Sequence, residues 1–160
     1  MKIGILEREY FSSKVFTQLN EIGEVTFYSQ NENLEEFLED KQIIYTRLKY
    51  FFNKRLIDYS KNLKFLVSPT TGLNHIDVDY CQKIGVEIIS LKGSEDLFKV
   101  NATPENTFGL LLSLLRNYKY FFSKSDFDIK TDRLVLPSYE IKNKKVGIIG
   151  FGRVGKLLSE

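Results

Sequence analysis

The stretch FLVSPTTGLNHIDVDYCQKIG, residues 65–85, predicts a strand, a loop and a helix in direct succession. An apolar, β-rich run ends at Ser68, and the residues from Pro69 to Asn74 are of the polar and turn-forming types. Apolar residues then recur at helical spacing, so that a helix should begin near Asp77. This stretch therefore predicts one unit of an α/β fold.

The same alternation continues on both sides of this stretch. Short apolar runs recur at about 20-residue intervals, at Lys2–Leu6, Glu24–Tyr28, Gln42–Thr46, Leu63–Ser68, Val86–Leu91 and Lys145–Ile149. Segments with helical spacing separate the first five runs and are long enough for right-handed crossovers between parallel strands. We therefore expect an open parallel sheet with helices on both faces.

Composition excludes several classes of protein. Of the 160 residues, 42% are hydrophobic and 28% are charged, which is typical of a globular chain. The net charge of +2 is scattered, so nucleic acid is not an expected partner, and no apolar run approaches the roughly 20 residues that span a membrane. A single cysteine, Cys81, and the absence of metal-ligand spacing predict a reducing cytoplasm and no metal site.

A strongly apolar helix is expected from Pro104 to Phe122, with Thr103 as its N-cap. Its apolar residues cover more than half of the circumference, so it needs cover on more than one side. It is either the central helix of one domain or a helix that bridges two domains or meets its copy in a second chain. The following residues to 144, which include Pro137, predict a connecting segment.

The clearest chemical signal is KVGIIGFGRVG, residues 145–155. It predicts a buried strand over Val146–Ile149, a tight glycine turn and the start of a helix. Three glycines at this spacing allow the turn, the approach of a pyrophosphate to the backbone, and close contact between helix and strand. A dinucleotide-binding turn is therefore favoured over a purely structural one.

The loop of residues 69–74 permits two interpretations. Thr71 and Gly72 could present backbone N–H groups to an anion, or the loop could be a simple turn with Asp77 as helix N-cap. The only histidine, His75, is better interpreted as a turn residue than as a general base, and Cys81 as a buried packing residue. The basic residues at 47, 49, 54 and 55 could steer an anionic substrate, but a charged solvent face is the ordinary explanation for most of them.

Three segments in order, TTGLNHID, VNATPENTFGLLLSLLRN and VGIIGFGRVG, resemble motifs of the D-isomer-specific 2-hydroxyacid dehydrogenase family. The resemblance extends through essentially the whole chain, with departures at Thr70, Asn74 and Pro104. It implies a flavodoxin-like substrate domain over residues 1–100 and an interdomain and dimerisation helix with its connecting segment over 101–144. Residues 145–160 would begin an NAD-binding Rossmann domain.

The resemblance also implies an activity and the residues that serve it. The expected reaction is NAD-dependent oxidation or reduction at the CH–OH group of a small 2-hydroxy acid, with NADP left open as cofactor. The main-chain amides of Thr71, Gly72 and Leu73 would hold the substrate carboxylate. The cofactor would be bound by Thr107, Gly150, Gly152, Arg153, Val154 and Gly155. The helix over 104–122 would form a homodimer.

No catalytic residue is expected within this chain, because the arginine, glutamate and histidine of the family are expected beyond residue 160. We therefore expect an N-terminal portion that binds NAD weakly or not at all and catalyses no turnover. The alternative is a non-catalytic flavodoxin-like module that dimerises through the helix over 104–122 or binds a small anion.

Overall fold

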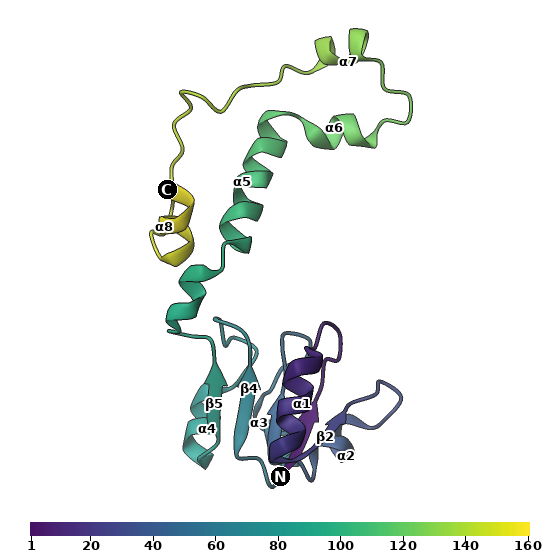
Figure 1. Ribbon diagram of the computed structural model, residues 1–160, viewed down its shortest axis with the longest axis vertical. Coiled ribbons are helices and arrows are strands. Elements are labelled where there is room, and N and C mark those ends of the chain that lie inside the picture. Colours follow the sequence, from purple (N-terminus) through teal and green to yellow (C-terminus); the bar gives the residue numbers. More distant parts are fainter. The chain divides into compact units, whose positions relative to one another are not determined.

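The computed structural model describes residues 1–160, apart from the side chains at positions 129 and 133. The chain divides into two compact units, Met1–Ser94 and Glu95–Glu160 (Figure 1). No helix among the described residues has the length and apolar character needed to cross a membrane.

The first unit is built on a five-stranded sheet in which every pairing is parallel, as the sequence predicts. Its strand order is β2-β1-β3-β4-β5, which is the order of flavodoxin-like folds. The strands are β1 (Lys2–Ile5), β2 (Glu24–Phe27), β3 (Ile43–Tyr45), β4 (Phe65–Ser68) and β5 (Glu87–Ser90). Each lies within the corresponding predicted run.

Four helices connect these strands, and Figure 1 shows α1 in front of the sheet and α3 behind it. They are α1 (Ser13–Ile22), α2 (Leu34–Leu38), α3 (Lys54–Tyr59) and α4 (Val78–Ile84). Side chains of Ser12, Asn33, Asn53 and Asp77 cap their N-termini. Asp77 accepts a hydrogen bond from the Tyr80 amide at 3.0 Å, which confirms it as an N-cap.

The core of this unit lies between the sheet and its helices. Its central residues, all with almost no exposed surface, include Leu38, Ile44, Phe52, Leu66 and Cys81. The predicted packing role of Cys81 is confirmed. Burial raises the pKa of its thiol, because the charged thiolate would lose its hydration there.

A buried carboxylate joins the ends of β1 and β3. Glu7, with 6% of its surface exposed, accepts hydrogen bonds from the amides of Arg47 at 2.6 Å and Lys49 at 3.0 Å. The hydroxyl of Thr46 donates a further bond at 3.3 Å. Glu7 thus satisfies backbone donors that would otherwise be left unpaired where β3 ends.

The second unit is mainly helical. It contains a 3-10 turn, η1 (Glu95–Lys99), followed by α5 (Ala102–Leu115), α6 (Tyr118–Ser123), α7 (Ile129–Val135) and α8 (Arg153–Ser159). Helices α5 and α8 are in contact. Asn101, and not the predicted Thr103, is the N-cap of α5. Pro104 is the third helical residue, where a missing N–H is still tolerated because no intrahelical acceptor faces it.

The prediction of one continuous helix over 104–122 is wrong. The helix breaks at Asn117, whose φ of 54° is left-handed, a conformation that asparagine tolerates well. A distant segment occupies the end of α5: the Tyr139 amide donates to the Leu115 carbonyl at 2.9 Å, and Asn117 Nδ2 donates to the Pro137 carbonyl at 2.8 Å. These bonds give partners to the Leu115 carbonyl and the Asn117 side chain at the C-terminal end of α5.

Two further differences concern residues 123–149. The predicted connecting segment contains α7, which Asp128 caps by accepting from the Lys130 amide at 2.9 Å. The structure assigns no strand to residues 145–149, and Ile149 is fully exposed where a buried strand was predicted. A strand needs a hydrogen-bonded neighbour, and none of the described strands pairs with this segment.

The Glu7 contacts predict a stability effect. In Glu7→Gln, one carboxylate acceptor becomes an NH2 donor that faces backbone donors, so the free energy of unfolding should fall by about 1–3 kcal/mol. Urea denaturation of the chain measures this change. Glu9→Gln, at an exposed position nearby, is the control. Equal effects of the two substitutions would contradict the role given to Glu7.

The burial of Cys81 predicts that its thiol is unreactive in the native chain. A raised pKa leaves less thiolate at neutral pH, and burial blocks access, so labelling by iodoacetamide should be slow until urea unfolds the protein. Mass spectrometry over time measures the modification. Complete labelling under native conditions at the rate of a free thiol would show that the core around α4 opens readily.

Candidate functional site

The loop after β4 lies at the carboxyl end of the parallel sheet, the edge where open α/β sheets bind ligands. Thr71 and Gly72 are exposed and Leu73 is half-buried. Among the described residues, no acceptor receives a hydrogen bond from the backbone amides of these three residues. The loop therefore has three amide donors without an acceptor among the described residues, and those of Thr71 and Gly72 are the two that the anion-binding interpretation names.

Side chains brace this loop from the inside. Ser68 Oγ lies 2.9 Å from Thr70 Oγ1 and 3.1 Å from His75 Nε2, and the Thr70 hydroxyl donates to the Gly72 carbonyl at 2.8 Å. His75 is only 7% exposed, so it is a buried, hydrogen-bonded residue of the loop. The two interpretations of the loop are thus compatible, because the turn with its Asp77 cap also leaves amides unpaired.

A neighbouring loop is attached to the same structure. Phe52 forms an isolated parallel bridge with Ile76: its amide donates to the His75 carbonyl, and its carbonyl accepts from the Asp77 amide, both at 2.8 Å. The segments after β3 and β4 are therefore joined through their backbones. The sequence did not predict this connection, because a pairing between residues so far apart leaves no local pattern.

The basic residues near these loops are solvent-exposed, which confirms the prediction of a charged face. Arg47 Nη1 donates to the Glu9 carbonyl at 3.3 Å, and Arg55 pairs with Glu35 at 3.1 Å. Lys49 and Lys54 lie over aromatic rings.

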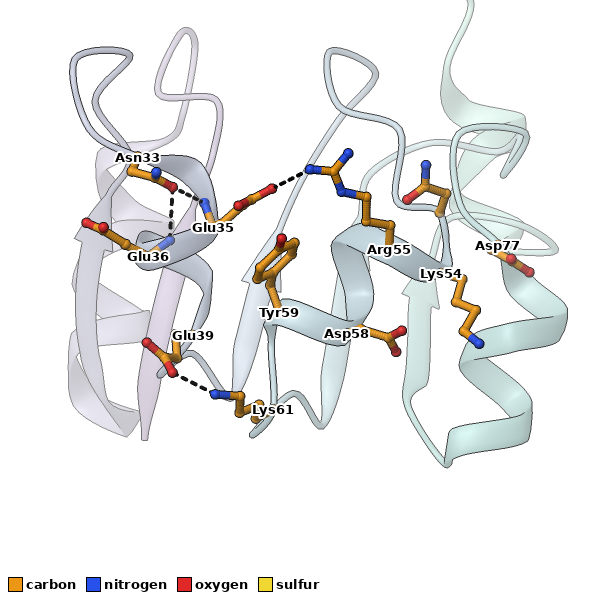
Figure 2. A pocket seen from close by; sticks show the side chains of 11 residues that line it. Asn33, Glu35, Glu36, Glu39, Lys54, Arg55, Asp58, Tyr59, Lys61 and Asp77 are labelled. Atoms are coloured by element: carbon orange, nitrogen blue, oxygen red, sulfur yellow. Dashed lines mark hydrogen bonds and ion pairs between the residues drawn. The ribbon is translucent and has the colours of Figure 1, made fainter.

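A large surface depression of about 960 Å³ lies between α2 and α3 (Figure 2). Ion pairs cross it, from Glu35 to Arg55 at 3.1 Å and from Glu39 to Lys61 at 2.8 Å. Several of its other polar side chains, including Asn33, cap helices. The two ion pairs and the helix caps thus occupy many of the polar groups in the depression. It is lined by helices and does not present the unpaired backbone donors found at the loop after β4.

In the second unit, two positions of the glycine turn require glycine, although no strand precedes the turn. Gly150 has a φ of 92°, which favours glycine, and a Cβ on Gly155 would lie 2.6 Å from the Gly150 carbonyl oxygen. The turn and α8 are therefore so close at Gly155 that there is room for a hydrogen atom on its Cα but not for a Cβ. Gly152 is the N-cap of α8, and the amides that follow it have no acceptor within the helix.

The other predicted cofactor residues lie on helices of this unit. Thr107 is on α5 and donates its hydroxyl to the Thr103 carbonyl at 2.8 Å. Val154 is half-buried on α8. The Arg153 side chain donates to the carbonyls of Leu97 at 2.8 Å and Val100 at 3.0 Å, so it secures the end of η1. The predicted contribution of Arg153 to cofactor binding is its backbone amide, and these side-chain bonds do not involve that amide.

The described residues contain no group of three or more His, Cys, Asp or Glu side chains arranged to hold a metal ion. The predicted substrate residues lie in the first unit and the predicted cofactor residues in the second. Each set is assembled within its own unit.

Comparison with known proteins shows which family the chain resembles. The family model for the D-isomer specific 2-hydroxyacid dehydrogenase catalytic domain matches residues 5–97. The chain is 28% identical over 131 residues to a formate dehydrogenase of Candida boidinii, covering 79% of this chain and 35% of that protein. It is 25% identical over 158 residues to a glyoxylate reductase of Thermococcus onnurineus, covering 95% and 44% respectively.

Among solved structures, the NAD complex of an NAD-dependent formate dehydrogenase from Staphylococcus aureus is similar, with a TM-score of 0.78 and 24% identity. That similarity covers 99% of this chain and 52% of the other, and it supports the fold. The chain thus spans about half or less of the length of these relatives. Because the family model matches more than half of the chain, the protein belongs to the D-isomer specific 2-hydroxyacid dehydrogenase family.

Proposed function

We propose that this protein serves in NAD-dependent oxidation or reduction of a small 2-hydroxy or 2-oxo acid. The observation that carries the proposal is the loop after β4, whose three unpaired amides lie within the segment matched by the family model. Residues 1–100 would form the substrate domain. We also propose that the protein is located in the cytoplasm.

Within the loop, the amides of Thr71, Gly72 and Leu73 would bind the substrate carboxylate. Neutral backbone donors suit this role because they bind a carboxylate without a counter-charge whose desolvation would oppose binding. The exposure of Thr71 and Gly72 leaves access for the ligand. The loop would thereby orient the C2 carbon of the acid.

The glycine turn in the second unit fits a dinucleotide. The contact between Gly155 and the Gly150 carbonyl brings α8 against the turn, and the free amides at the start of α8 would face the pyrophosphate. NAD, when bound, would accept or supply the hydride. Both the formate dehydrogenase of S. aureus and the D-lactate dehydrogenase of Aquifex aeolicus were solved as NAD complexes, which supports the same cofactor for this protein. The choice between NAD and NADP stays open.

A titration monitored by amide NMR shifts tests the substrate half. Pyruvate should shift the amides of residues 71–73 in the 160-residue chain, whereas methyl pyruvate, which lacks the carboxylate, should not. Shifts elsewhere, or none, would refute this assignment. NADH at millimolar concentration should weakly perturb residues 150–155. A response at 71–73 with no response at 150–155 would support the substrate site and leave the cofactor site without support in this chain.

The second unit also supports a homodimer. Leu110 and Leu114 on α5 and Phe122 on α6 expose 62%, 75% and 81% of their surfaces, an unusual amount for large apolar side chains. They lie within the segment 104–122 for which a dimer is predicted, although that segment forms two helices. We propose that a second copy of the chain covers these residues.

Replacement of a single leucine tests the dimer. Leu114→Glu should yield a monomer, because a carboxylate would have to be desolvated in the interface. Leu134→Glu, at a position on α7 that is 81% exposed but outside the proposed surface, should leave the dimer intact. Light scattering after size-exclusion chromatography gives the mass. A monomeric wild-type chain would show the proposed dimer to be wrong.

A further inference from the structure

One buried group in the site has no role in the proposed function. His75 is the only histidine, and it is 7% exposed. Its Nε2 lies 3.1 Å from Ser68 Oγ, and its Nδ1 has no hydrogen-bond partner among the described residues. The Phe52 amide holds its backbone carbonyl at 2.8 Å. The histidine is therefore held on the inner side of the loop after β4 by one side-chain and one backbone hydrogen bond.

The direction of each hydrogen bond around His75 follows from counting hydrogens. A carbonyl oxygen only accepts, so Thr70 must donate its single hydroxyl hydrogen to the Gly72 carbonyl at 2.8 Å. The 2.9 Å contact between Ser68 and Thr70 must then use the hydrogen of Ser68. With that hydrogen committed, the 3.1 Å contact with His75 requires an N–H on Nε2.

The other ring nitrogen has no hydrogen-bond partner. An N–H on Nδ1 would be a buried donor without an acceptor among the described residues. A bare acceptor lone pair is less costly at this position. The Nε2–H tautomer is therefore the one that suits this site, and the bonds run in one direction from His75 through Ser68 and Thr70 to Gly72.

This series of bonds ends on the peptide group that matters for substrate binding. The Gly72–Leu73 peptide is trans, so its N–H points opposite to its carbonyl. Because Thr70 holds the Gly72 carbonyl, the Leu73 N–H points away from Thr70, and it has no acceptor among the described residues. We propose that His75, acting through Ser68 and Thr70, is a positioning residue that holds the Leu73 amide ready for the substrate carboxylate. This inference rests on the proposed function.

The tautomer is the first test. Long-range proton–nitrogen NMR of the nitrogen-15-labelled chain at neutral pH yields one set of imidazole signals, because the chain has one histidine. Nε2 should carry the proton and Nδ1 should be bare. An Nδ1–H tautomer, or an equal mixture of both, would overturn the inference.

Matched substitutions provide the second test. Thr70→Val removes the hydroxyl and should weaken pyruvate binding about fivefold, whereas Thr70→Ser keeps it and should bind like the wild type. His75→Gln keeps a donor near the position of Nε2 and should bind better than His75→Asn, whose shorter side chain does not reach Ser68. Amide shifts give the affinities, and urea denaturation of each variant gives its stability.

The outcomes separate the inference from the proposed function. If pyruvate binds Thr70→Val and Thr70→Ser equally well, only the positioning role is wrong. The same conclusion follows if the lost affinity of Thr70→Val is fully explained by its unfolded fraction. If the wild-type chain does not bind pyruvate, the proposed function is wrong, and the substrate role of His75 falls with it.

Discussion

The parallel direction of all five strands constrains everything else in the first unit. Because every strand ends at the same edge of the sheet, the segments that follow β1, β3 and β4 gather there. Their backbone donors need acceptors, and two contacts supply them: the Glu7 carboxylate binds the segment after β3, and Phe52 pairs with Ile76 after β4. These contacts pair part of the edge internally, and the amides of residues 71–73 are left without an acceptor among the described residues.

Those remaining amides would allow a loop without a charged side chain to bind an anion, as proposed. Thr71 and Gly72 are exposed, and the interior of the loop is occupied by Ser68, Thr70 and His75. The histidine lies on the inner side, where it can order the loop without meeting solvent. This division of roles is physically reasonable because backbone dipoles bind best when their orientation is fixed before the ligand arrives.

The second unit depends on close backbone contacts of a different kind. Gly155 lies against the Gly150 carbonyl because neither position has a side chain to separate them, and Arg153 binds two carbonyls at the end of η1. The apolar side chains of α5 and α6, in contrast, remain largely exposed. The second unit thus combines a tight glycine turn with an exposed apolar surface, for which we propose a second copy of the chain as partner.

The sequence by itself determined the features that depend on near neighbours: the five strands, the Asp77 cap, the burial of Cys81 and the glycine turn at 150–155. Apolar period, capping chemistry and glycine spacing are local signals. Tertiary structure alone decided the break at Asn117, where residues 137–139 occupy the helix end, and the pairing of Phe52 with Ile76. It also decided the bonds of His75 and the unpaired state of residues 145–149. Each of these depends on whether a distant backbone or side-chain group supplies a hydrogen-bond partner, which no local pattern encodes.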